Sequence, residues 1–367
     1  MSTLPLWQTP IRHGCYQIGH RHPESLLQCN TYLRTFDSSN AKPVHWCIDP
    51  GSQIDYPQIR AHLLEHIGEL RALRMFSINH QDPDIVGNLT FLTRDHPHLT
   101  GLATQDVWRL VRHLDVKPSN LYFAEHAHKG EVRLPGSQII QVVPTPFCHF
   151  RGAVAFYDPE SRVLFSGDLF GGLNIPGRVQ LYGEEEDWPG IAQFHQIYMP
   201  TSAAVAHAIR RITSLHPAVE VIAPQHGFVL TGPFMHSVLE RLGRLPMGLD
   251  LMDIELDNRF LADYSAVVHN LVQAVARELG WLDVMMRLRD LPEGHELRAY
   301  VHVTAREVHL DRNGIRAIPL LLEVLAHDLP LHIRELLRVG ILTLCTQHGV
   351  PLPPVGVGVE ETGSPLQ

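Results

Sequence analysis

The sequence has few cysteines, no basic cluster and no long apolar run. Its five cysteines are scattered, odd in number and form no C-x-x-C pair, which excludes a disulfide framework and a thiolate zinc motif. Lys and Arg do not cluster beyond the pair Arg210 and Arg211, and the net charge is −9, so we expect no nucleic-acid partner. The longest apolar stretch, near residues 318–326, is far shorter than the ~20 residues of a membrane helix.

The N-terminus also lacks the basic start and apolar core of a signal peptide. Scattered, unpaired cysteines are typical of a reducing compartment. We therefore expect a soluble, cytoplasmic protein with no membrane partner. What the sequence has in abundance is histidine, with 25 residues, and this favours metal chemistry carried by side chains.

The 367 residues are enough for one large domain and a smaller one. β-rich segments over residues 10–50 are followed by alternating strand and helix patterns up to about residue 242, which predicts a layered α/β fold. The pattern changes near Pro246. A helix with an apolar stripe over residues 261–279, a hairpin and a helix over residues 318–337 then predict an α+β domain. We expect two domains, 1–245 and 246–367.

Four segments of the first domain share one pattern: an apolar strand, a break at Pro or Gly, and then a side chain that can bind a metal. In the first segment His80, Asp82 and Asp84 alternate, just after the strand predicted at residues 73–78. We expect Pro83 to keep this segment from becoming a helix. In an extended loop the alternate side chains share one face, so one imidazole and two carboxylates would converge there.

The other three segments each contribute one side chain. His149 follows a proline-rich strand end, Asp168 follows a Ser-Gly pair and His226 follows a Pro-Gln pair. Ligand sites of α/β folds cluster at the carboxyl ends of strands. Taken alone, each histidine has a purely structural alternative, and the aspartate could cap the next turn. Four such segments in order favour one shared metal site.

These six side chains, three imidazoles and three carboxylates, resemble the site of the metallo-β-lactamase superfamily. They are, in order, His80, Asp82, Asp84, His149, Asp168 and His226. The resemblance is greatest to the oxygen-binding di-iron branch, the lactamase-like domain of flavodiiron proteins, and covers residues 1–240. It implies an αββα sandwich, here with the α+β domain appended. The zinc hydrolases of the superfamily use His-x-His-x-Asp-His, whereas the di-iron branch has a carboxylate in the second position, as this chain does.

The resemblance also implies a ligand set for two iron ions. One iron takes His80, Asp82 and His149, the other takes Asp84 and His226, and the remaining aspartate bridges them. The three carboxylates supply a formal charge of −3 against +4 for two divalent ions. Mixed imidazole and carboxylate ligation with open positions is typical of non-haem iron rather than zinc.

Two positions depart from the pattern of the di-iron branch. Ile85 stands where a histidine commonly follows the last aspartate, which leaves the second iron two or three protein ligands and an open position for water or a gas. Asp82 is shorter than the glutamate that is typical of its position. Nearby, His20 and His22 lie in a loop that could overhang the site, with a solvated turn as the alternative.

The function implied by the resemblance is binding of dioxygen or nitric oxide, with reduction of the gas in an oxidoreductase. Residues 246–367 contain no phosphate loop of the flavodoxin kind, so we expect no flavin domain in this chain. The protein would be a reductase with an external electron-donor protein, or an oxygen or redox sensor with a signalling partner. We expect a homodimer with the striped helix as its interface. The alternative is a zinc- or manganese-dependent hydrolase that uses a metal-bound hydroxide.

Overall fold

The structure is a computed structural model that describes residues 5–19, 21–22, 25–38, 41–175, 177–251, 260–304 and 307–355. The chain forms two compact units. The first unit comprises Met1–Pro23, Leu27–Asn174 and Arg178–Leu245, and the second comprises Glu24–Leu26, Ile175–Gly177 and Pro246–Gln367. Among the described residues, no helix combines the length and apolarity that crossing a bilayer requires.

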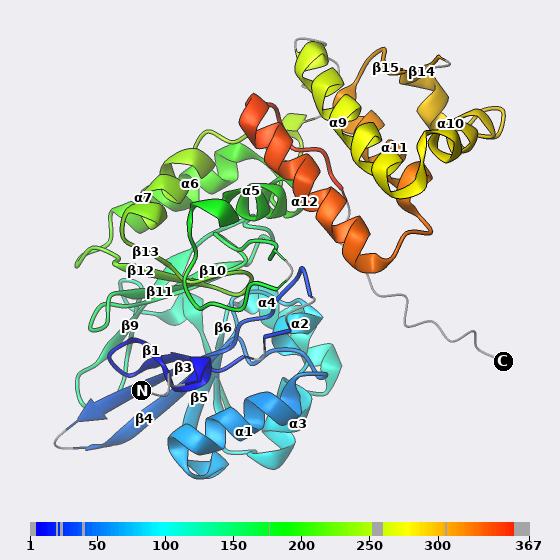
Figure 1. Cartoon of the computed structure of the whole chain (residues 1–367). Coiled ribbons are helices and arrows are strands. Elements are labelled where there is room, and N and C mark those ends of the chain that lie inside the picture. Colours follow the sequence, from blue (N-terminus) through cyan, green and yellow to red (C-terminus); the bar gives the residue numbers. More distant parts are fainter. Residues whose placement is uncertain are drawn as a thin grey trace, which may run out of the picture. The chain divides into compact units, whose positions relative to one another are not determined.

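The first unit contains two β-sheets (Figure 1). The seven strands of the first sheet lie side by side in chain order: β1 (Pro10–Arg12), β2 (Cys15–Gln17), β3 (Tyr32–Ser38), β4 (Ala41–Ile48), β5 (Leu73–Ser77), β6 (Thr100–Ala103) and β7 (Asn120–Phe123). Neighbours are antiparallel from β1 to β4 and parallel from β4 to β7. The parallel half places the carboxyl ends of β4, β5 and β6 at one edge.

The second sheet has the order β13-β12-β11-β10-β9-β8. Its strands are β8 (Glu131–Arg133), β9 (Ile139–Pro144), β10 (Val154–Asp158), β11 (Val163–Gly167), β12 (Val221–Pro224) and β13 (Leu230–Thr231). Only β11 and β12 are parallel among these described pairs. Their carboxyl ends therefore lie next to each other, with Gly167 opposite Pro224.

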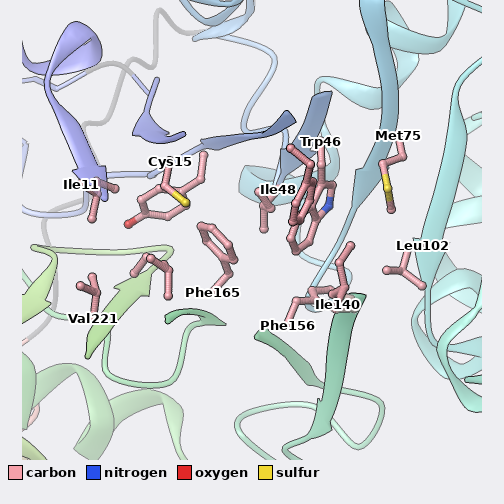
Figure 2. Packing of buried hydrophobic residues seen from close by; sticks show 14 of the residues in the cluster. Ile11, Cys15, Trp46, Ile48, Met75, Leu102, Ile140, Phe156, Phe165 and Val221 are labelled. Carbon is pink, nitrogen blue, oxygen red and sulfur yellow. The ribbon is translucent and has the colours of Figure 1, made fainter. Parts of the chain in front are cut away.

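The two sheets pack face to face through apolar side chains. Figure 2 shows this layer, with Trp46 of β4 in the first sheet close to Phe156 and Phe165 of the second. The ring of Trp46 meets these two rings edge-on, at centroid distances of 6.0 and 5.3 Å. Such edge-to-face pairs bury a large apolar area and fix how the facing strands are aligned.

Helices cover the outer faces of both sheets (Figure 1). The first sheet is covered by α1 (Tyr56–Ile67), α2 (Pro83–Val86), α3 (Leu89–Asp95) and α4 (Gln105–Val111), whose buried residues join those of the sheet in a second apolar cluster. The second sheet is covered by α5 (Trp188–Tyr198), α6 (Ser202–Thr213) and α7 (Gly232–Leu242). The layers are thus helix, sheet, sheet, helix, which confirms the expected αββα sandwich.

The second unit is α+β, as expected. It contains α9 (Leu261–Leu279), α10 (Trp281–Arg289), a hairpin of β14 (Val301–Val303) and β15 (Val308–Leu310), α11 (Gly314–Ala326) and α12 (Leu331–His348). The single helix predicted over residues 318–337 is wrong, because the helical pattern breaks before Pro330, which disfavours helical backbone in the residue ahead of it.

The apolar stripe of α9 is buried inside this unit. Val268, Leu271, Val272 and Val275 are each no more than 3% exposed, and α9 contacts α10, α11 and α12. The stripe therefore forms the core of the second unit. It is not a free surface, and it does not supply the dimer interface that the sequence suggested.

Candidate metal centre

The four predicted segments meet because their strands end at the same edge of the sandwich. β11 and β12 run in parallel, so Asp168 and His226, which follow these strands, come out side by side. β9 runs in the same direction as β11, since both are antiparallel to β10 between them, and it leads to His149. His80 follows β5 of the other sheet.

Asn79 joins the two sheets beside His80. Its side-chain Nδ2 donates hydrogen bonds to the carbonyl of Val154 at 2.6 Å and to that of Phe165 at 3.0 Å, in β10 and β11. Its backbone NH donates to a carboxylate oxygen of Asp49 at 2.9 Å. The carboxyl end of β5 is therefore tied to the second sheet at the point where the candidate ligands emerge.

The first group of candidate ligands consists of His80, Asp82, His149 and Asp168, whose donor atoms all lie within 4.8 Å of one another. Nε2 of His149 lies 3.1 Å from Oδ2 of Asp82 and 3.1 Å from Oδ2 of Asp168. Nε2 of His80 lies 3.6 Å from Oδ2 of Asp82 and 3.4 Å from Oδ1 of Asp168. Two imidazoles and two carboxylates thus face a common point.

The second group consists of Cys29, Asp84 and His226, again within 4.8 Å of one another. Nε2 of His226 lies 3.3 Å from Oδ2 of Asp84, and the Cys29 sulfur lies 3.7 Å from the same oxygen. Gln225 also donates to this oxygen through Nε2 at 3.3 Å. The predicted residues Asp84 and His226 are therefore adjacent, with a cysteine that the sequence had not indicated.

Asp168 connects the two groups. Its Oδ1 lies 3.4 Å from Nε2 of His80 in the first group and 3.4 Å from Nε2 of His226 in the second, while Oδ2 faces His149. It is also buried, at 3% exposure. A carboxylate with one oxygen between imidazoles of both groups has the placement that a bridging ligand requires.

His80, Asp82 and Asp84 do not lie in the extended loop that the sequence predicts. Pro83 does not prevent a helix but begins one, α2, with Asp82 as the residue before it. A proline is tolerated at this first helical position because its missing NH has no intrahelical partner there. The three side chains therefore do not share one face of an extended loop. The turn of α2 sends Asp84 to the second group, and Ile85 is fully buried in the apolar cluster beneath the first sheet.

The loop that carries Asp168 is held in an unusual backbone conformation. Phe170 has a φ of 70°, in the left-handed region that favours glycine. Its NH donates to Nε2 of His195 at 3.0 Å, and Nδ1 of His195 donates to the Ile191 carbonyl at 2.8 Å within α5. Burial lowers the pKa of His195 to about 4, so the ring is neutral and Nε2 can accept. His195 thus anchors the Asp168 loop to α5.

The imidazoles and carboxylates stabilise each other's charged forms. Burial disfavours charge, yet Asp168 and Asp82 outweigh it at His149 and raise the pKa of that imidazole to about 10. At Asp168 burial is likewise outweighed, chiefly by His80, and the pKa is held well below its usual range. Metal ions bind deprotonated ligands, and a cation that displaced the imidazole protons would meet the same carboxylates.

The hydrogen bonding of the site fits a metal better than a closed polar network. Nε2 of His80, Nε2 of His149 and Oδ1 of Asp168 are buried. These imidazoles and carboxylates face one another at 3.1–3.6 Å, but within the described residues none of the three atoms makes a hydrogen bond of normal geometry. Buried polar atoms are rarely left without one. At His226, Nδ1 donates to the Gln28 carbonyl at 2.7 Å, which leaves Nε2 as the nitrogen available to a metal.

Of the two histidines expected near the site in the N-terminal loop, the structure describes only His22. His22 is half exposed and lies 3.0 Å from Asp55, in neither group. His20 falls outside the described residues. The residues that sequence reasoning missed are Cys29, which is far from the other ligands in sequence and lies in no metal motif, and His195, whose role depends on a contact between α5 and a distant loop.

Comparison with known proteins gives one family and a consistent set of relatives. The sequence model of the "ODP family beta lactamase" matches residues 27–227, more than half of the chain. The type A flavoprotein fprA of Rhodobacter capsulatus is 28% identical over 169 residues, which are 46% of this chain and 38% of that protein. The chain spans only 43% and 38% of the length of two curated relatives that it matches.

Solved structures share the fold of the first unit at low sequence identity. The apo state of the chemotaxis sensor ODP from T. denticola is 21% identical, covers 65% of this chain and 98% of its own, and has a TM-score of 0.53. A chemotaxis sensor ODP also matches as a peroxy diiron species, with 22% identity, 62% and 91% coverage and a TM-score of 0.52. Rubredoxin oxygen:oxidoreductase from the anaerobe Desulfovibrio gigas is 17% identical, with 64% and 60% coverage and a TM-score of 0.56.

Proposed function

The chain belongs to the ODP family of beta lactamases, and from this membership and the geometry of the site we propose that it is a non-haem di-iron protein that binds dioxygen or nitric oxide. The observation that carries the proposal is the position of Asp168 between two groups of imidazoles and carboxylates. One group would hold one ion and the other group would hold the second. We assign this chemistry to residues 1–245.

The composition of the site favours iron. Three carboxylates and three imidazoles are oxygen and nitrogen donors of the kind that non-haem iron takes. When bound, the two irons would supply the electrons and the open coordination positions that a diatomic gas requires. Zinc hydrolases of this fold have a more imidazole-rich site, whereas Asp82 places a carboxylate in the first group.

The protein's own residues orient the candidate ligands and place aromatic rings beside them. Gln28 and His195 orient His226 and the Asp168 loop through the hydrogen bonds described above. Rings of α5 pack over the imidazoles: Phe194 lies 5.1 Å from the ring of His226, and Tyr198 lies 6.2 Å from that of His149. These rings place apolar surface beside the candidate ligands.

Two modes of action share this site. In one, an external electron-donor protein reduces the irons and the chain works as an oxidoreductase. In the other, the oxidation state of the site is reported to a signalling partner, and residues 246–367 are the part available for that role. Among the relatives, one is named as an oxidoreductase and another as a chemotaxis sensor. We also propose a homodimer, with no interface assigned.

The proposal is tested by loading the protein with ferrous iron without oxygen, measuring iron per chain, and recording the visible spectrum before and after exposure to air. We expect about two irons per chain and a band that appears only with oxygen. Repeated turnover with a chemical reductant would indicate the reductase, and a single stoichiometric oxidation would indicate the sensor. Stoichiometric zinc with esterase activity would replace the proposal by the hydrolase alternative.

A further inference from the structure

Cys29 lies among the candidate ligands of the second group. Its sulfur is 3.7 Å from Oδ2 of Asp84, and it is close enough to Nε2 of His226 for one ion to reach all three donor atoms. The four other cysteines, Cys15, Cys47, Cys148 and Cys345, are buried free thiols outside both groups. Of the five cysteines, all of which lie in the described part of the chain, only Cys29 therefore belongs to a group of candidate ligands.

The segment around Cys29 is fastened to the loop that carries His226. On one side, the Gln28 carbonyl accepts from Nδ1 of His226 at 2.7 Å. On the other side, the backbone NH of Asn30 donates to the Gln225 carbonyl at 2.6 Å, and Nδ2 of Asn30 donates to the Pro224 carbonyl at 2.9 Å. Both neighbours of Cys29 are thus held against this loop, which fixes the thiol beside the His226 ring.

The second group also lacks donors that the first group has. Apart from the shared Asp168, the first group offers three nitrogen or oxygen ligands, whereas within the described part of the chain the second offers only Asp84 and His226. Ile85, which follows Asp84, is buried in the apolar cluster and contributes none. The Cys29 sulfur is the third donor atom of this group.

Building on the proposed di-iron site, we infer that Cys29 is a thiolate ligand of the metal ion in the second group, together with Asp84 and His226. The thiol proton passes to solvent as the metal–sulfur bond forms, since a metal binds the thiolate. A soft sulfur donor makes this ion chemically different from its neighbour, which has only nitrogen and oxygen donors. The two ions of the pair are therefore inequivalent.

The inference is tested with cobalt(II), added without oxygen to the full chain. Thiolate ligation produces a sulfur-to-cobalt charge-transfer band in the near ultraviolet that nitrogen and oxygen ligands do not produce. We expect this band in the wild type and in the matched control Cys148→Ala, which removes a buried thiol next to His149. In Cys29→Ala we expect the band to be lost and the second cobalt to bind at least tenfold more weakly.

A second measurement uses the wild type alone and does not depend on how the variant folds. Alkylation of Cys29 by iodoacetamide, followed by mass spectrometry, should be at least tenfold slower in the cobalt-loaded protein than in the metal-free protein. Two bound cobalt ions with no charge-transfer band, or equal alkylation rates with and without cobalt, would overturn the role of Cys29 and leave the di-metal site standing. Failure to bind cobalt or iron at all would overturn both the role of Cys29 and the proposed di-metal site.

Discussion

Replacing His195 by alanine probes a residue that lies in neither group of candidate ligands but holds the loop of one. His195 is fully buried, and its Nε2 accepts the Phe170 NH at 3.0 Å. Phe170 has a left-handed φ of 70°, a conformation that costs a residue other than glycine about 1–2 kcal/mol. The hydrogen bond to His195 offsets this cost. Without it we expect the loop to relax and Asp168, two residues earlier, to leave its position between the two groups.

The size of the effect follows from what the substitution removes. Loss of the acceptor leaves the Phe170 NH unsatisfied, at a cost of about 1–3 kcal/mol. Truncation of the buried ring leaves a cavity, which costs about 2 kcal/mol or more. We therefore expect His195→Ala to lower the free energy of unfolding by about 3–5 kcal/mol. Metal affinity should fall by about 10–100-fold, as is typical when a residue that orients a ligand is lost.

Urea unfolding of the metal-free protein and metal titration of the folded protein measure the two effects separately. His195→Gln keeps a hydrogen-bond acceptor and should lose less stability and less metal affinity than His195→Ala. The matched control is Tyr157→Phe, which removes the hydroxyl that donates to the Pro217 carbonyl at 2.7 Å, far from the site. This control should lose about 1 kcal/mol of stability and none of the metal affinity. Unchanged metal affinity in His195→Ala would refute the reasoning.

Four further predictions concern the metal centre and its surroundings. Asp168→Ala should lose both metals, because this carboxylate faces both groups, whereas Asp84→Ala should lose one. Two metals found by metal analysis in Asp168→Ala would exclude a bridging role for this carboxylate. His22→Ala should leave the metal content unchanged, because His22 lies in neither group. Burial lowers the pKa of His195 to about 4, whereas the same imidazole in the unfolded chain is protonated below about pH 6.5. The unfolded state therefore binds one more proton than the folded state between these pH values, and the free energy of unfolding should fall by up to about 3 kcal/mol from pH 6.5 to 4. In urea titrations, the metal-free His195→Gln variant should not show this fall in the free energy of unfolding between about pH 6.5 and 4. Removal of metal by a chelator should lower the melting temperature, by an amount that corresponds to about 2.7 kcal/mol at a metal concentration 100 times Kd.

The sequence predicted which side chains meet but not all the reasons for their meeting. Apolar strands that end in Pro or Gly pointed to side chains that the structure brings together, because strand ends share an edge of a sandwich. The pairing that matters most is the parallel contact of β11 with β12, which sets Asp168 beside His226. This contact joins segments more than 50 residues apart and has no local signal. At Pro83 the expected absence of a helix was wrong, since a proline that breaks the interior of a helix is favoured at its first position.

Two functional candidates were beyond the reach of local patterns. Cys29 comes before a strand in the β-rich start of the chain and belongs to no cysteine motif, so only the contact between its segment and the His226 loop reveals it. His195 resembles an ordinary helix residue until α5 packs against the loop of Phe170. In the second unit, Pro330 did carry a local signal for the end of a helix.

The most direct test of the central claim is diffraction from iron-loaded crystals, measured on both sides of the iron absorption edge. We expect two anomalous peaks at the edge of the sandwich, one enclosed by His80, Asp82 and His149 and the other by Asp84 and His226, with a carboxylate between them. A single peak, a peak with the absorption edge of zinc, or iron bound elsewhere would contradict the account.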